Sequence, residues 1–247
     1  MREFQDRSGE SWALIKRQDT DNTKLAIFIH GFLGSHLTTW GNLPTLIRNH
    51  ADSDSISAEW DYVFLGYDTR NVETYLDIAE LICSEWNKAR TASRPYNRTY
   101  TKLALFGHSL GTLGIRQLLC AWSIQPDGML DAVHSVTLFG TPLNGSPYAK
   151  FMKSLLGYKI ADALRPQNPQ LRMLKIWLKS VYSKNPWKPV RIILGQDDKI
   201  VGFQYAELIE WPGDDRPEYT VLNHRELVKP LSWNNSKVVD YICNALR

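Results

Sequence analysis

The sequence predicts an α/β fold: a mostly parallel central sheet with helices on both faces and a helical insertion over the ends of the strands. Short apolar runs alternate along the chain with longer amphipathic stretches, and this alternation is typical of strands joined by crossover helices. The runs are almost unbroken, as expected for strands covered on both faces. With 247 residues, of which 43% are hydrophobic and 22% charged, residues 1–247 are expected to form a single domain with a sizeable core.

Each element follows from a run or a periodic stretch. The expected strands are the short apolar runs 25–29, 62–66, 103–106, 136–139, 190–194 and 219–222. The expected helices are the longer amphipathic stretches 37–49, 73–88, 110–123 and 236–246. Strand and helix in alternation predict right-handed crossovers between parallel neighbours.

The stretch 146–187 interrupts the alternation, because it is too long for one crossover helix and contains Pro166 and Pro169. It is expected to be a helical cap over the strand ends. Apolar residues in its second half recur at helical spacing, and Met173, Ile176 and Trp177 widen that apolar face. The recurring residues are Leu171, Leu174, Leu178 and Val181. The large apolar side chains of the cap either line an acyl pocket or only pack the cap onto the core. These side chains are Phe151, Met152, Leu155, Leu156, Trp177 and Leu178.

Charge is concentrated around this cap, although the whole chain carries only +3. From Leu143 to Pro189 there are nine basic residues and a single acid, Asp162, which is a net charge of +8. One interpretation is a surface for an anionic partner, such as a phospholipid membrane surface or an anionic substrate. The other is an ordinary solvated helix face.

Several function classes are excluded by what the sequence lacks. It has no phosphate-binding glycine motif, no H-E-x-x-H and no paired C-x-x-C, so we expect no metal, no organic cofactor and no nucleic-acid partner. Its apolar runs are too short to span a bilayer, and its first ten residues lack the apolar segment of a secretory signal. Three widely spaced cysteines are typical of a reducing compartment. A soluble, cytoplasmic protein is therefore expected.

Gly107-His108-Ser109-Leu110-Gly111 fits the pattern G-x-S-x-G. An apolar strand leads into it and an apolar-periodic helix leads out, so the serine would sit on a sharp strand-to-helix turn with its hydroxyl at the helix N-terminus. That setting predicts a nucleophilic Ser109. The alternative is a glycine-rich turn that only happens to contain serine.

A nucleophilic serine on such a turn requires an acid and then a histidine later in the chain. Of the six histidines, only His224 follows the last expected strand, so it is the expected general base. The acid should follow the strand 190–194, where Asp197 and Asp198 are adjacent. Their positions alone do not separate these two aspartates.

The remaining requirement is a pair of hydrogen-bond donors for the negative oxygen formed in acyl transfer. One expected donor is the backbone N–H of Leu110, the residue after the nucleophile. The second donor should come from the glycine-containing loop 29–34. The alternative is that this loop is only a flexible turn.

Taken together, these motifs resemble those of the α/β-hydrolases, in particular the lipase-like serine esterases. His30-Gly31-Phe32 resembles their oxyanion loop and implies Phe32 as the second backbone donor, whereas Gly195-x-x-Asp198-x-x-Val201 resembles their acid loop and implies Asp198 rather than Asp197. The segments 139–146 and 224–230, with Trp40, are similar to serine esterases related to inositol deacylases. The matches run from about residue 25 to 230, and the cap matches only in position.

This resemblance implies an enzyme that cleaves carboxylic esters, including lipid esters or thioesters, by a Ser-His-Asp acyl-enzyme mechanism. The expected site is therefore Ser109, Asp198 and His224, with Phe32 and Leu110 as oxyanion donors. The alternative is a binding or receptor module that keeps the fold without turnover.

Overall fold

The computed structural model of the chain describes residues 2–7, 12–17, 21–50, 57–125, 128–149, 157–184, 190–202 and 217–247. Within these ranges eight strands form one sheet in the order β1-β2-β4-β3-β5-β6-β7-β8. They are β1 (Arg2–Arg7), β2 (Trp12–Arg17), β3 (Lys24–Ile29), β4 (Trp60–Leu65), β5 (Lys102–His108), β6 (Val133–Phe139), β7 (Val190–Gly195) and β8 (Glu218–Thr220). The strands from β4 to β8 are parallel, and β1 and β2 are antiparallel at one edge. The mostly parallel sheet predicted from the sequence is confirmed.

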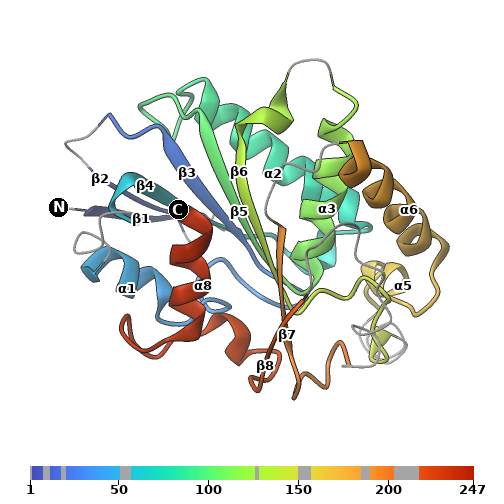
Figure 1. Cartoon of the computed structure of the whole chain (residues 1–247). Helices are drawn as coiled ribbons and strands as arrows, with labels where there is room; N and C mark the ends of the chain where they lie inside the picture. The colour runs from blue at the N-terminus through green and yellow to red at the C-terminus, as the bar shows by residue number, and fades with distance from the viewer. Residues whose placement is uncertain are drawn as a thin grey trace.

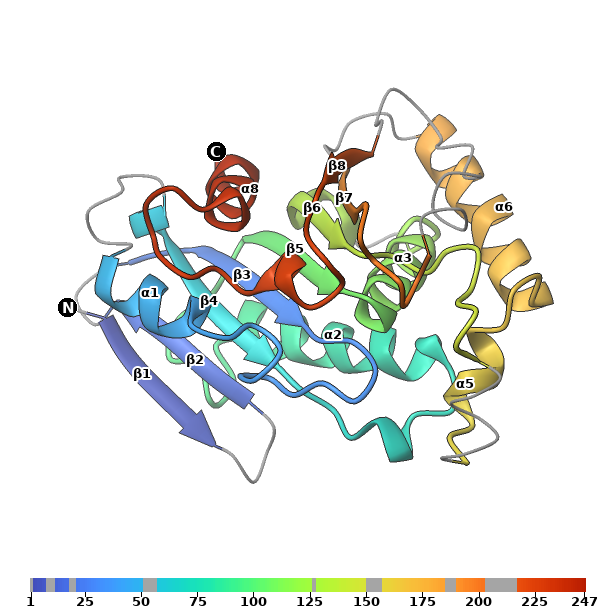
Figure 2. The same cartoon turned by 90° about the horizontal axis from the view of Figure 1, so that it is seen from below.

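Helices cover both faces of this sheet, as predicted, with α2 and α3 on one face and α1 and α8 on the other (Figures 1 and 2). The α-helices are α1 (Leu43–His50), α2 (Tyr75–Arg90), α3 (Leu110–Trp122), α5 (Ile160–Ala163), α6 (Pro169–Lys184) and α8 (Lys237–Leu246). The short 3₁₀ helices are η3 (Ser57–Glu59), η4 (Thr69–Asn71), η5 (Met129–Ala132) and η6 (Glu226–Val228). In the described part of the chain, no helix is both long enough and apolar enough to cross a bilayer.

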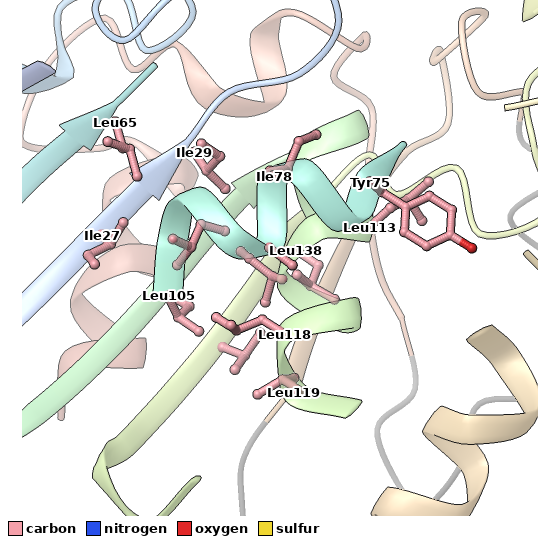
Figure 3. Packing of buried hydrophobic residues seen from close by; sticks show 14 of the residues in the cluster. Ile27, Ile29, Leu65, Tyr75, Ile78, Leu105, Leu113, Leu118, Leu119 and Leu138 are labelled. Atoms are coloured by element: carbon pink, nitrogen blue, oxygen red, sulfur yellow. The ribbon is translucent and has the colours of Figure 1, made fainter. Parts of the chain in front are cut away.

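The strand residues alternate between two cores. On β3, Ile27 and Ile29 pack under α2 and α3, whereas Ala26 and Phe28 face the α1 and α8 side. Figure 3 shows the first core, in which side chains of α2 and α3 meet those of the sheet. In the second core the Phe28 ring stacks on Phe106 at 4.5 Å between ring centroids. Because both faces are buried, close packing fixes the positions of the central strands.

Two features of the fold differ from the sequence expectation. The strands β1 and β2 are not among the strands expected from the sequence. In β1, five of the six residues are polar and the strand has a partner on one side only, so it lacks the apolar run of a buried strand. In contrast, β2 begins with the buried apolar run Trp12 to Ile15, a run that is missing from the strands expected above. The helix expected from residue 37 begins at Leu43. Turns occupy 36–42, and Gly41 has a φ of +56°, which a helix cannot accommodate.

The cap expected over 146–187 is described over 146–149 and 157–184. Helix α6 begins at Pro169, where the missing N–H of proline is tolerated, and the residues predicted to recur on its inner stripe are buried against the domain. These residues are Leu171, Leu174, Leu178 and Val181. Met173, Ile176 and Trp177 instead face solvent, with 49%, 53% and 50% of their surface exposed, because α6 is buried along the stripe that includes its contact with α3.

Candidate active site

Ser109 lies on a strained turn between the end of β5 and the start of α3. Its φ of 52° and ψ of −123° are dihedrals that cost a non-glycine residue about 1–3 kcal/mol. Glycine neighbours make this turn possible: a Cβ on Gly111 would lie 2.5 Å from the carbonyl oxygen of His30, and one on Gly107 would lie 2.8 Å from Ile115. The serine N–H donates to the carbonyl of Phe139 at 2.9 Å, which fastens the turn to the neighbouring strand β6.

The predicted acid and base are hydrogen-bonded to one another. The Nδ1–H of His224, in the loop after β8, donates to Asp198 Oδ2 at 2.6 Å. The other carboxylate oxygen of Asp198 accepts the backbone N–H groups of Ile200 at 2.9 Å and Val201 at 3.0 Å. Asp198 and His224 are 5% and 8% exposed, whereas Asp197 is exposed. The structure thus brings His224 together with Asp198 and leaves Asp197 in solvent.

The serine and the histidine line one cavity of about 500 Å³. In the described residues, Ser109 Oγ makes no hydrogen bond to His224, an arrangement common in ligand-free hydrolases, where this contact closes only when substrate binds. Gly140 lies beside the acid and base, because a Cβ there would be 3.1 Å from His224 Nδ1 and 3.2 Å from Asp198 Oδ2. The turn that carries Ser109 and the Asp198–His224 pair therefore lie together at the ends of β5, β6 and β7.

His108 is a positioning residue that sequence reasoning missed. Its Nε2–H donates to the backbone carbonyl of His224 at 2.8 Å, and the two rings lie 4.6 Å apart. Burial, and then the nearby His224, lower the pKa of His108 well below its usual value, so the ring stays neutral. The bond ties the histidine loop to the strand that carries Ser109. It joins residues 116 positions apart, and no local sequence pattern signals such a contact.

The loop after β3 is held by a second neutral histidine. His30 Nδ1–H donates to the carbonyl of Gly31 at 2.7 Å, and His30 Nε2 accepts the backbone N–H of Tyr67 at 3.0 Å. Burial lowers the pKa of His30 to about 4, which keeps Nε2 free to accept. The Tyr67 hydroxyl also donates to the His30 carbonyl at 3.0 Å. Three hydrogen bonds therefore fix the start of the predicted oxyanion loop.

That loop passes directly over the nucleophile. A Cβ on Gly31 would lie 2.5 Å from the Cβ of Ser109 and 3.1 Å from its Oγ, so only glycine allows this approach. The next residue, Phe32, packs its ring edge-to-face on Tyr158 at 5.0 Å. Within the described chain, the backbone N–H groups of Phe32 and Leu110 donate to no backbone carbonyl. Both are available to a bound oxygen atom.

The cavity is built from the loops that follow five parallel strands, β3, β5, β6, β7 and β8. Such loops at the carboxyl ends of a parallel sheet are where ligands bind in α/β folds. Apolar lining residues include Phe32, Leu164 and Ile200. The cap residues Trp177 and Leu178, considered above for an acyl pocket, do not line it, and the residues 151–156 lie outside the described ranges.

In the described ranges, no group of three or more His, Cys, Asp or Glu side chains could hold a metal ion. Ser109 and His224 line one cavity, His224 is hydrogen-bonded to Asp198, and these are the residue types of a nucleophile, a base and an orienting acid. Such a set performs proton transfer and nucleophilic attack on a carbonyl.

Solved structures with a similar arrangement of elements include lipases and a phospholipase. The chain superposes on the mature lipase BlEst2 of Bacillus licheniformis with a TM-score of 0.54 and 15% identity, covering 88% of this chain and 92% of the lipase. The monoacylglycerol lipase of Paleococcus ferrophilus superposes with a TM-score of 0.54 and 16% identity, covering 90% of this chain and 93% of the lipase. Phospholipase PlaB of Legionella pneumophila superposes with a TM-score of 0.56 and 20% identity. The match covers 70% of this chain but only 38% of the phospholipase, so the chain spans well under half of that protein. These likenesses show that the fold is that of the α/β-hydrolases.

The sequence itself carries the family assignment. No curated protein sequence matches the chain. A family described as putative serine esterase (DUF676) matches residues 19–176, more than half of the chain and a range that includes the loop 29–34 and the turn 107–111. The chain belongs to this serine esterase family.

Proposed function

We propose that this serine esterase hydrolyses carboxylic esters in two steps through an acyl-enzyme on Ser109. His224 Nε2 takes the proton of the Ser109 hydroxyl, and the oxygen attacks the ester carbonyl carbon. The protonated His224 then gives that proton to the departing alcohol, which leaves the acyl group on Ser109. A water molecule, deprotonated by the same imidazole, attacks the acyl-enzyme; the imidazolium then returns the proton to Ser109 Oγ as the bond to the acyl group breaks and the acid leaves.

One observation carries this proposal: the 2.6 Å bond between His224 Nδ1 and Asp198. A carboxylate at Nδ1 holds the proton there, so Nε2 keeps the lone pair that a general base needs. The carboxylate also stabilises the imidazolium formed during attack. His108 supports the same geometry by holding the His224 backbone from the other side.

The backbone N–H groups of Phe32 and Leu110 are the proposed donors to the oxyanion. Leu110 is the first residue of α3, where backbone N–H groups have no partner within the helix and the helix dipole favours negative charge. Phe32 follows the glycine that lies against Ser109. Two such donors, fixed before substrate arrives, lower the energy of the tetrahedral intermediate.

The proposed substrates are esters with an apolar acyl group, lipid esters and thioesters included. Apolar side chains line much of the cavity around Ser109, and apolar surface buried by an acyl chain favours binding by about 25 cal/mol per Å². The names of the structural neighbours, which are lipases and a phospholipase, support the same class.

A fluorophosphonate probe tests the mechanism against a binding module without turnover. The probe should label the wild-type protein at Ser109, as located by peptide mass, and should not label Ser109→Ala. Wild-type protein should also hydrolyse p-nitrophenyl esters, whereas Ser109→Ala should lose about six decades of turnover. Binding of the esters without labelling or hydrolysis would contradict the proposal and favour the receptor module.

The cap is proposed to contact an anionic membrane surface. Helix α6 exposes Met173, Ile176 and Trp177 at helical spacing, with the exposed cations Arg172 and Lys179 beside them, and this combination suits the interface of an anionic bilayer. Elsewhere in the cap, Lys159 pairs with Glu73 and Arg165 with Asp162. The proposed contact uses the exposed apolar face of α6.

Co-sedimentation with vesicles tests this contact. Vesicles containing phosphatidylglycerol should sediment the wild-type protein at low salt and release it at high salt, because surface charge is screened. Trp177→Ser should weaken sedimentation, and Lys237→Gln, an exposed cation on α8, is the matched control. Binding that ignores both salt and Trp177→Ser would contradict the proposal.

A cytoplasmic location is proposed from the cysteines. Within the described residues, Cys83, Cys120 and Cys243 form no disulfide, which suits a reducing compartment. Fractionation of cells that express the full-length protein tests this location.

A further inference from the structure

The cavity around Ser109 has two walls of different origin. Leu164 belongs to the core shared with α2, α3 and α6, and Phe32 packs against that core. Val228 belongs to the other core, shared with α1 and α8. All three residues line the cavity, so the cavity is bounded by residues from the two cores that lie on opposite faces of the sheet. The two walls can therefore hold two different parts of one substrate.

Two cations mark the second wall. Arg225 and Lys229 flank Val228 and both line the cavity. The stem of Lys229 lies against Gly41, whose added Cβ would be 3.3 Å from Lys229 Cγ. The missing side chain there and a φ of +56° let the lysine stem lie close to the backbone. This contact holds the lysine stem beside the cavity.

No acidic side chain lines this cavity among the described residues. Asp198 is turned to His224 and to two backbone N–H groups, and Glu226 accepts the backbone N–H of Asn223 at 3.1 Å. Arg225 and Lys229 make no ion pair within the described chain. The field of Lys229 reaches the site, because its charge is among the lesser causes, after burial, that lower the pKa of His108. The wall therefore presents net positive charge to a ligand.

We propose that Arg225 and Lys229 form a subsite for an anionic group, a phosphate in particular, on the alcohol part of the ester. The acyl chain then lies on the opposite wall, formed by Phe32 and Leu164. A guanidinium and an ammonium together suit a phosphate, the first as a bidentate donor and the second as a point charge. This inference rests on the proposed ester hydrolysis and adds a substrate class to it.

Two soluble esters with the same acyl chain test the subsite, 1-butyrylglycerol and 1-butyrylglycerol 3-phosphate. Wild-type protein should show a kcat/KM ratio that favours the phosphate ester. The double variant Arg225→Gln/Lys229→Gln should lower that ratio about tenfold, equal to 1.4 kcal/mol, and Lys229→Glu should lower it too. The ratio should fall with added salt in the wild type, because exposed charges are screened. The matched control Lys237→Gln should leave both rates unchanged.

The outcomes separate the subsite from the reaction. If neither ester is cleaved, the proposed ester hydrolysis fails. If the neutral ester is cleaved and the ratio is the same in the wild type and the double variant, the subsite fails while the reaction stands. Inorganic phosphate distinguishes the sources of the anion: competitive inhibition of the neutral ester, lost in the double variant, supports the subsite. Such inhibition without any preference for the phosphate ester would mean that the cations bind free phosphate, and would overturn the substrate assignment.

Discussion

Replacing Asp198 by asparagine removes one charge and changes almost no volume, so it isolates the electrostatic role of the acid. The carboxylate accepts three hydrogen bonds, from His224 Nδ1 and from the N–H groups of Ile200 and Val201. An asparagine amide has one oxygen and one NH₂ group. The NH₂ group must therefore face either the Nδ1–H of His224 or the backbone N–H groups of Ile200 and Val201, and it cannot accept a hydrogen bond from any of them.

The structure indicates which end faces which partner. If the NH₂ group faced the loop, the N–H groups of Ile200 and Val201 would lose their acceptor, at a cost of about 1–3 kcal/mol for each buried donor. The amide oxygen therefore stays with the loop, and the NH₂ group donates to His224 Nδ1. That bond moves the imidazole proton to Nε2, the atom that must accept the proton of Ser109. We expect kcat to fall about 10⁴-fold, or about 5 kcal/mol in the barrier.

Asp197→Asn is the matched control, because it changes the adjacent aspartate, which is exposed. Steady-state hydrolysis of p-nitrophenyl butyrate gives kcat for both variants, and thermal unfolding shows whether each is folded. Asp197→Asn should stay within twofold of the wild type. A folded Asp198→Asn protein within tenfold of the wild type, or a larger loss in Asp197→Asn, would refute this account of the acid.

Three further predictions concern the oxyanion loop, the buried histidine and the cap. Gly31→Ala places a Cβ 2.5 Å from the Cβ of Ser109, so the loop must shift; kcat should fall about 10²–10³-fold, and a change below threefold would count against Phe32 as a donor. His30 has its pKa lowered to about 4 by burial, so the unfolded chain binds the proton first as pH falls. The free energy of unfolding should therefore drop by about 2–3 kcal/mol between pH 7 and pH 4.5. Urea titrations should show a smaller drop in His30→Gln, and equal drops would refute the assignment. Leu174→Ala, at 1% exposed, should cost about 2–5 kcal/mol of unfolding free energy, whereas Ile176→Ala, at 53% exposed, should stay within about 0.5 kcal/mol.

The strands of the central sheet could be predicted because burial on both faces leaves an unbroken apolar run in the sequence. The run Leu25 to Ile29 became β3, and the run ending at Phe106 became β5. The strand β1 left no such signal, because an edge strand is stabilised by backbone pairing with β2 and needs no apolar side chains. The position of β1 depends on its pairing with β2, and a local sequence pattern does not show which strands pair.

The candidate site divides in the same way. Ser109 and His224 followed from a local motif and from chain order, and the structure places both on one cavity. The choice between Asp197 and Asp198 needed a family resemblance, because adjacent residues in a loop differ only in where each side chain points. The bonds of His108 to His224 and of Tyr67 to His30 join distant parts of the chain. Such contacts arise only after folding, so composition and spacing could not reveal them.

The two neutral histidines explain how a strained serine can be part of a stable domain. The turn at Ser109 costs about 1–3 kcal/mol, and its neighbours must be fixed for the strain to persist. His108 fastens β5 to the histidine loop, and His30 fastens the oxyanion loop to the residues after β4. Both rings are neutral because they are buried, and a neutral imidazole can donate at one nitrogen and accept at the other. Protonation of His30 would remove the acceptor that holds the Tyr67 backbone N–H, so acid should loosen the loop that follows β3.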